Sequence, residues 1–296
     1  MNDANILLPF QFHNIPVRGR LLRLNNLATH IPSLATPTEC TQTLAEMLAA
    51  AALLAHDTKH TLAVSLQLQH PELGALAFAN CSTTQGQNQE PTSVLKAYAN
   101  PAAQTTSFET IAATDGGLFA VTLEPADLSN RYQSLIPLTG KSAAECLAYY
   151  FQHSVQTPTL FVVFTNTHSA TALMLQALPP TAEQEPVPED DWTRLGLLLQ
   201  TLTEQEALDP DLAPETLLMR LFAEDDLSTY EAEHPSFATD DPRPRMLAAL
   251  ASLPPQELAD LIAMGTITLT DNTSGITVSF TAAELTHLQD TSEKPN

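Results

Sequence analysis

The sequence predicts an α+β fold, because segments with strand patterns outnumber helical ones and do not alternate with them one by one. Apolar–polar alternation and β-branched content predict strands at residues 15–24, 61–69, 73–80, 117–124, 159–165 and 171–178. Helical spacing of apolar residues predicts helices at residues 41–55 and 142–154. These patterns favour a core with a mixed sheet and helices packed on it over a doubly wound parallel sheet.

The two helices differ in character. The segment "LAEMLAAAALLA" (residues 44–55) is apolar but too short and too rich in alanine to span a bilayer, so we expect a buried core helix. The second helix follows Ser142, with Glu145 three residues later, which is the pattern of a capped helix start.

Charge divides the chain into unlike parts. Residues 1–179 carry 11 acidic and 7 basic residues (net −4), whereas residues 180–296 carry 23 and 5 (net −18). The proline-rich and acidic stretch "PPTAEQEPVPEDD" (179–191) is typical of an exposed connector. We therefore expect a core domain over residues 1–179, an acidic helical linker over 180–236, and a small C-terminal lobe over 237–296.

The linker contains apolar residues at helical spacing, flanked by acids. They are Trp192, Leu195, Leu199 and Leu202 in a first set and Leu217, Leu218, Leu221 and Phe222 in a second. Most amphipathic helices simply dock, so a helical cap on the core is one interpretation. The other is a marginally stable segment whose apolar face can be offered to a partner.

The lobe is predicted to hold helices over residues 243–252 and 255–264, then a two-stranded ribbon in "ITLTDNTSGITVSF" (267–280). A last helix starts at Thr281, with Glu284 completing a capping box. The apolar residues expected to form a core without a metal are Met246, Leu247, Leu250, Leu253, Leu258, Leu261, Ile262, Ile267, Leu269, Ile276, Val278, Phe280, Leu285 and Leu288.

Composition argues against several classes of function. A net charge of −22 repels nucleic acid and anionic membranes, so neither is an expected partner. The N-terminus lacks the pattern of a secretory signal. Cys40, Cys81 and Cys146 are scattered and odd in number, which favours free thiols in a reducing cytoplasm.

No credible catalytic group emerges, and no cofactor is expected. "LTGKSAAE" (138–145) contains Gly-Lys-Ser, but Leu135 stands where a phosphate-binding loop needs its first glycine. "HDTKH" (56–60) places two histidines one helical turn apart without a third ligand, so an ordinary helix end is the better interpretation. The sequence therefore predicts that the protein is not an enzyme.

Several stretches in order resemble one family, the bacterial redox-regulated holdase chaperone heat-shock protein 33. The stretches are "FQFHNIPVRGRLLRL" (10–24), "LAEMLAAAALLA" (44–55), "RYQSLIPLTGKSAAECLAYYFQHSVQTPT" (131–159), "LMLQALP" (173–179), "RLFAEDDLSTYE" (220–231) and "LAALASLPPQELADLI" (247–262). The resemblance spans residues 6 to about 290. It implies an α+β core, a charged helical linker and a small zinc domain whose oxidation releases zinc and exposes apolar surface to unfolding proteins.

The family's zinc is held by a Cys-X-Cys pair and a Cys-X-X-Cys pair, and this sequence departs from both. The resemblance places the first pair on Thr239 and Asp241 and the second on Asp271 and Ser274. Hydroxyls and short carboxylates neither hold zinc as thiolates do nor form disulfides. We therefore expect no zinc and a folded lobe without metal, and leave open a weak hard-cation site at Asp241 and Asp271.

The resemblance implies a holdase-type chaperone for unfolding proteins that lacks the thiol and zinc switch and is constitutive or controlled by heat or pH. The alternative is a dedicated interaction protein that keeps the fold without general chaperone activity. A homodimer is left open. The candidate client-binding residues are Trp192, Leu195, Leu199, Leu217, Leu218, Leu221 and Phe222.

Overall fold

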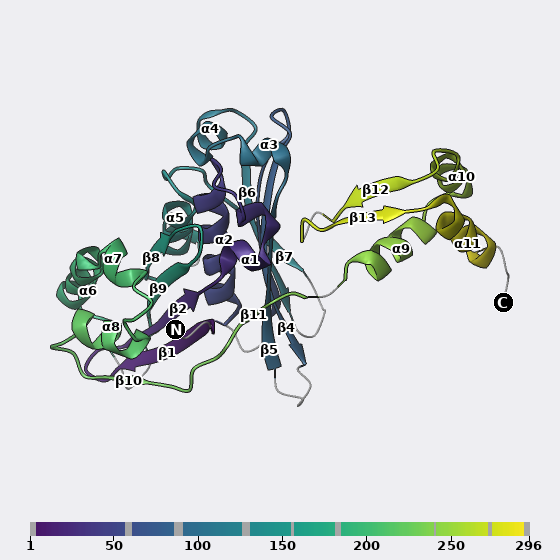
Figure 1. The fold of residues 1–296 in the computed structure, drawn as a ribbon. Helices are drawn as coiled ribbons and strands as arrows, with labels where there is room; N and C mark the ends of the chain where they lie inside the picture. Colours follow the sequence, from purple (N-terminus) through teal and green to yellow (C-terminus); the bar gives the residue numbers. More distant parts are fainter. Residues whose placement is uncertain are drawn as a thin grey trace. The chain divides into compact units, whose positions relative to one another are not determined.

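The computed structural model describes residues 4–56, 61–85, 91–125, 131–154, 157–180, 185–239, 241–271 and 274–292. The chain divides into two compact units, Met1–Ala238 and Thr239–Asn296 (Figure 1). Its mixed strand and helix content confirms the predicted α+β class. Among the described residues, no helix is long and apolar enough to cross a membrane.

The first unit contains a five-stranded sheet that is antiparallel throughout, in the order β10-β1-β2-β9-β8. The bounds are β1 Ile6–Phe12, β2 Val17–Leu24, β8 Thr159–Thr165, β9 Ala170–Ala177 and β10 Leu227–Thr229. The inner strands β2 and β9 are buried almost along their whole length, because layers pack on both faces of this sheet.

A six-stranded sheet follows the order β11-β5-β4-β3-β6-β7 and is antiparallel except for the β11–β5 pair. The bounds are β3 Thr61–His70, β4 Ala75–Gln85, β5 Pro91–Ala99, β6 Leu118–Pro125, β7 Tyr132–Ile136 and β11 Ser236–Phe237. Along β3, buried Val64, Leu66 and Leu68 alternate with more exposed polar residues. This alternation gave the strand its sequence signal and indicates that one face carries the core.

The core lies between the two sheets, where helix α2 (Thr41–Ala55) packs against both (Figure 1). Its described side chains are buried except one, which confirms the predicted buried helix. Helix α5 (Ala143–Ser154) also packs on α2, and Glu145 N donates to Ser142 Oγ at 3.2 Å, as expected of a helix start. The short elements are α1 Leu27–His30, η1 Pro32–Leu34, α3 Pro101–Gln104 and α4 Phe108–Ala113.

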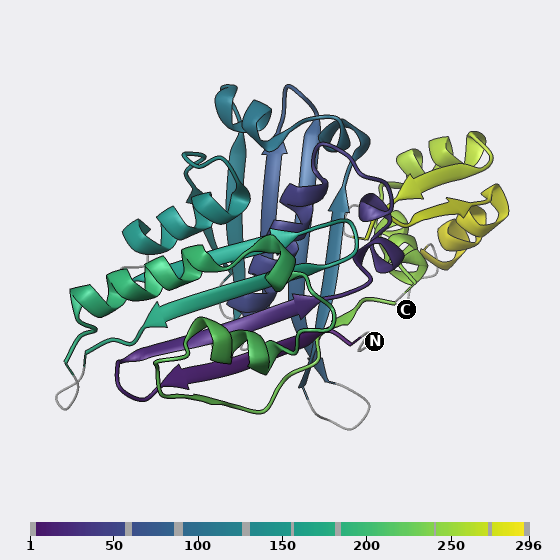
Figure 2. The same ribbon diagram turned by 60° about the vertical axis from the view of Figure 1, so that its left-hand side comes forward.

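A helical cap covers the other face of the five-stranded sheet (Figure 2). It consists of α6 (Glu189–Thr201), α7 (Glu204–Ala207) and α8 (Pro214–Leu221). The chain then continues through β10 to β11, so the segment 230–238 connects the edges of both sheets; this segment is called the strap below.

The second unit is a helix and hairpin lobe: α9 Arg243–Ala251, α10 Pro255–Ala263, β12 Ile267–Thr270, β13 Thr277–Phe280 and α11 Ala282–Ser292. These elements agree with the predicted ones, including the capping box, in which Thr281 N donates to Glu284 Oε2 at 2.9 Å. Every apolar residue expected in the lobe core belongs to one cluster except Ile276, which is 39% exposed. The lobe thus has a small apolar core of its own.

Candidate functional site

The interface between the cap and the sheet is organised by three aromatic rings. Phe222, at the end of α8, packs against Phe12 at 5.1 Å between ring centroids and against Phe10 at 6.1 Å. The Phe10 ring fits because its neighbour across the β1–β2 pair is Gly19, where a Cβ would lie 2.1 Å from the ring. Glycine at this position therefore makes room for the Phe10 ring beneath the cap.

The predicted client-binding residues are mostly buried in this interface. Their exposed fractions are Leu195 0%, Leu199 5%, Leu217 2%, Leu218 0%, Leu221 8% and Phe222 1%, while Trp192 is half-buried. The structure therefore brings them together, but against the sheet and not at the surface. Sequence reasoning missed the sheet residues that face them, Phe10 and Phe12.

Polar contacts also tie the cap to the sheet. The buried Arg23 of β2 donates from Nη1 to Leu212 O at 2.6 Å, and Thr171 Oγ1 of β9 donates to Ala207 O at 2.7 Å. Within the cap, Arg194 donates through both terminal nitrogens to Asp225 at 2.6 and 2.8 Å. Arg23 Nε has no partner, and burial lowers the pKa of this guanidinium despite nearby carboxylates.

The strap is held at the end of α2 by an ion pair. His56 Nε2 lies 2.8 Å from Glu233 Oε2 and 2.8 Å from Ser93 Oγ, and His56 Nδ1 donates to Ala52 O at 2.6 Å. The Glu233 carboxylate and the Ser93 hydroxyl thus share one ring nitrogen of His56, and the Ala52 carbonyl lies on the other. In a hydrolytic triad the carboxylate must lie on the nitrogen opposite the nucleophile, so these three residues form a latch and not a catalytic triad.

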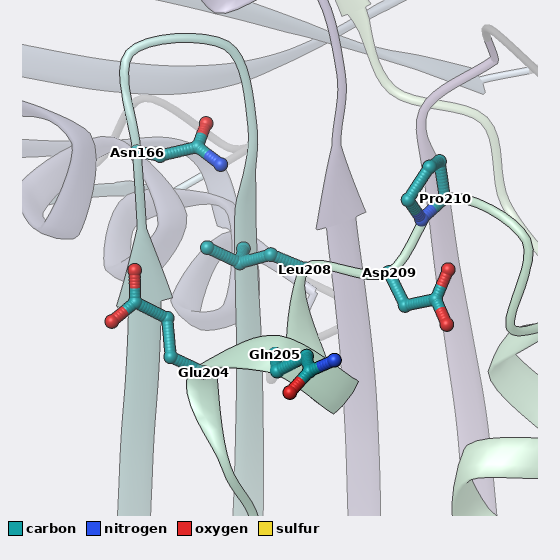
Figure 3. A pocket seen from close by; sticks show the side chains of 6 residues that line it. All are labelled: Asn166, Glu204, Gln205, Leu208, Asp209 and Pro210. Carbon is teal, nitrogen blue, oxygen red and sulfur yellow. The ribbon is translucent and has the colours of Figure 1, made fainter.

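A pocket of about 690 Å³ opens where the β8–β9 loop meets the cap (Figure 3). Its lining residues are Asn166, Glu204, Gln205, Leu208, Asp209 and Pro210. The side-chain oxygen Oδ1 of Asn166 already accepts hydrogen bonds from the backbone N–H groups of His168 and Ser169. The six lining residues include no serine, threonine, cysteine or lysine that could serve as a nucleophile.

The backbone N–H groups of the Gly-Lys-Ser segment already bond to side chains of the following helix. Gly140 N donates to Cys146 Sγ at 3.3 Å, and Lys141 N donates to Glu145 Oε2 at 2.8 Å. These N–H groups are therefore not presented to a phosphate. Residues 57–60 of "HDTKH" lie outside the described part of the chain.

All three thiols are free and buried, with exposed fractions of 3% for Cys40 and 0% for Cys81 and Cys146. Burial raises the pKa of each thiol, and that of Cys81 reaches about 12. Because the thiolate is the form that peroxide oxidises, these groups are in protonated and unreactive environments at neutral pH.

The positions that the resemblance assigns to zinc ligands do not fit zinc. Asp271 Oδ2 accepts bonds from Ser274 Oγ at 2.5 Å, from Ser274 N at 3.0 Å and from Arg245 Nη2 at 2.7 Å. Asp241 Oδ1 accepts from Arg243 N at 2.9 Å. Within the described part of the chain, no three His, Cys, Asp or Glu side chains come together as a metal site requires. Hydroxyl and carboxylate oxygens that are already engaged in hydrogen bonds, without any thiolate, have little affinity for zinc.

Comparison with known proteins supports a chaperone class for this fold. The family model described as Hsp33 protein matches residues 5–281. A 33 kDa chaperonin of Ectopseudomonas mendocina is 31% identical over 255 residues, covering 86% of this chain and 83% of the relative. One of Pseudomonas aeruginosa is 33% identical over 257 residues, covering 82% and 80%.

A crystal structure of the 33 kDa chaperonin from Thermotoga maritima superposes with a TM-score of 0.75, covering 97% of this chain and 98% of that one. At 20% identity this match shows the shared fold. The chain is thus a molecular chaperone by class. It belongs to the Hsp33 family, as its sequence motifs predicted.

Proposed function

We propose that this protein is a holdase-type chaperone that binds unfolding proteins without a thiol and zinc switch. Residues 180–236 act as the moving linker, and residues 239–292 form a lobe without metal. The observation that carries the proposal is that all three cysteines are buried with raised pKa values, while oxygen-bearing side chains occupy the four positions of the switch. An oxidant then has no accessible thiol on which to act.

Release of the cap is the step that would expose apolar surface. Helix α6 buries only Leu195 and Leu199 of its thirteen residues, and its first turn carries three acidic side chains. Segments with few buried contacts open at low free energy. Undocking would uncover Phe10 and Phe12 on the sheet and Phe222 on the cap together, which gives an unfolding protein an aromatic surface to bind. Heat favours this opening, because it releases conformational entropy.

Light scattering of a thermally unfolding model enzyme tests the proposal. The protein is added after treatment with reductant, after treatment with peroxide, or untreated. Equal suppression of aggregation in all three states is the expected result. Suppression only after peroxide would overturn the proposal, because it would require an oxidisable switch.

The alternative, a dedicated interaction protein, is favoured by one observation: the candidate client-binding residues are buried in the docked cap. A cap that never undocks would keep these residues buried, while other apolar side chains of the cap, such as Leu197 and Met219, are already exposed. Failure to suppress aggregation in any state, with co-purification of one stoichiometric partner, would favour this reading.

The proposal includes a non-enzymatic role and a cytoplasmic location. The first is supported by the latch geometry at His56, which lacks the arrangement of a triad. The second is supported by three unpaired thiols, which are typical of a reducing compartment.

A further inference from the structure

Two arginines of the lobe lie at the N-terminal end of a helix, where positive charge is electrostatically unfavourable. Arg243 and Arg245 lie in the first turn of α9, which contains no acidic residue. The N-terminus of a helix carries partial positive charge, so basic side chains there are destabilising unless other groups compensate. Both side chains reach away from their own helix to such groups.

Arg245 joins α9 to the turn of the hairpin. Its Nη2 donates to Asp271 Oδ2 at 2.7 Å, and Asp271 is 9% exposed. The same oxygen accepts from Ser274 Oγ and Ser274 N, so one carboxylate holds the turn closed and binds the helix. Charge-assisted hydrogen bonds to a buried carboxylate are stronger than neutral ones.

Arg243 joins α9 to two further elements. Its Nη1 donates to Glu284 Oε1 of α11 at 2.6 Å, and its Nη2 donates to Ser279 O of β13 at 2.7 Å. Its guanidinium carbon lies 4.9 Å from the centroid of the Phe280 ring, which is fully buried in the lobe core. The backbone N–H of Arg243 is capped by Asp241.

We propose that Arg243 and Arg245 form a clamp that replaces a metal ion in holding the lobe together. The segment before α9 and the turn of the hairpin carry the two pairs of positions that the resemblance assigns to zinc ligands. Arg245 binds Asp271 in the hairpin turn, and Arg243, whose backbone N–H is capped by Asp241 of the first segment, binds β13 and α11 through its guanidinium. A guanidinium binds through fixed donors and has no redox chemistry, so peroxide leaves this clamp intact.

Hydrogen exchange of the intact chain tests the clamp through the backbone amides of β12 and β13. Arg245→Met and Arg243→Met keep an aliphatic side chain and remove the charged donors. We expect exchange in the hairpin about tenfold faster in each variant, because each variant loses charge-assisted hydrogen bonds that tie α9 to the hairpin. The exposed Arg220→Met in α8 is the matched control and should leave the hairpin unchanged. Unchanged hairpin exchange in both lobe variants would overturn the proposal.

Metal analysis of the unmodified chain keeps the test independent of how the variants fold. We expect less than about one zinc per ten chains in freshly purified protein, and no change in hairpin exchange after a zinc chelator is added. One zinc per chain, with protection lost on chelation, would overturn the proposal. Both readouts concern the lobe alone, so they are separable from the aggregation assay that tests the chaperone function.

Discussion

Phe222 of the cap packs edge-on against Phe12 of the sheet, with 5.1 Å between ring centroids and an interplanar angle of 81°. Two residues 210 positions apart in the sequence thus join the acidic helices to the core. T-shaped aromatic pairs of this kind add roughly 0.5–1.5 kcal/mol to the burial of the rings. This contact marks the surface that must open if the cap is the moving part of the chaperone.

Truncation of Leu218 should loosen the cap. Leu218 is fully buried in α8, so Leu218→Ala should destabilise the docked cap by roughly 2–5 kcal/mol through lost packing and a cavity. We expect suppression of client aggregation to begin at a lower temperature. The neighbouring Met219 is 61% exposed on the same helix, so Met219→Ala is the matched control. Identical onset temperatures in the two variants would argue against cap release.

A methyl group at Gly19 should displace Phe10. Its Cβ would lie 2.1 Å from the ring, so Gly19→Ala should cost roughly 1–3 kcal/mol in the free energy of unfolding. Replacing the ring by a smaller side chain in the double variant Gly19→Ala/Phe10→Leu should recover part of this loss, because the clash is removed. Urea denaturation of the single and double variants measures the coupling. If the free-energy changes of the Gly19→Ala and Phe10→Leu substitutions simply add in the double variant, the two residues are not in contact.

The latch between His56 and Glu233 should give the strap a pH dependence. The hydrogen bond from His56 is the largest cause that lowers the pKa of the Glu233 carboxyl below its ordinary value of 4.5, and the charge of Arg20 adds to it. A lowered folded-state pKa means that the stabilisation is present above about pH 4.5 and is lost as the pH falls through the folded-state pKa. Glu233 is half exposed, so solvent screening limits the effect to about 1 kcal/mol or less.

Hydrogen exchange of the amides of residues 236–238 measures this latch. Glu233→Gln should speed exchange at pH 7, while the two forms should converge once the pH falls below the lowered folded-state pKa of Glu233, where its carboxyl is neutral. The nearby exposed Glu231→Gln is the control. If the exchange rates of the Glu233→Gln variant and the unmodified chain differ as much in acid as at pH 7, the ion pair is not the source of the difference.

The thiols should resist modification in the folded protein. Because burial raises the pKa of Cys81 to about 12, the thiolate fraction at pH 7 is very small. We expect alkylation of Cys40, Cys81 and Cys146 only after unfolding, as counted by intact mass. Rapid labelling of any of them under native conditions would identify an accessible thiol and reopen a sulphur-based switch.

Local patterns predicted much of this fold. Alternation located β3, and helical spacing with Pro and capping residues located every helix of the lobe. The strands β1, β5 and β7 and the short strands β10 and β11 were missed. β5 reads "PTSVLKAYA", which begins with proline and has alanine, a residue with weak strand preference, at two of its five buried positions. β7 is a short edge strand with three exposed residues.

The candidate site was only half visible in the sequence. Spacing identified Leu217, Leu218 and Phe222 as one apolar helix face, but it could not show which surface covers that face. The partners Phe10 and Phe12 are set by strand pairing far away in the chain. The latch was invisible for the same reason, since His56 and Glu233 meet only through tertiary structure. Long-range pairing of this kind has no local signature.

The most direct test of a chaperone without a thiol switch is hydrogen exchange across α6, α8 and the hairpin, with and without peroxide, at increasing temperature. We expect peroxide to change protection in none of these elements, and heat to remove it first from α6 and α8, at the temperature where aggregation begins to be suppressed. Loss of protection in the cap or the hairpin on adding peroxide at constant temperature would contradict this mechanism.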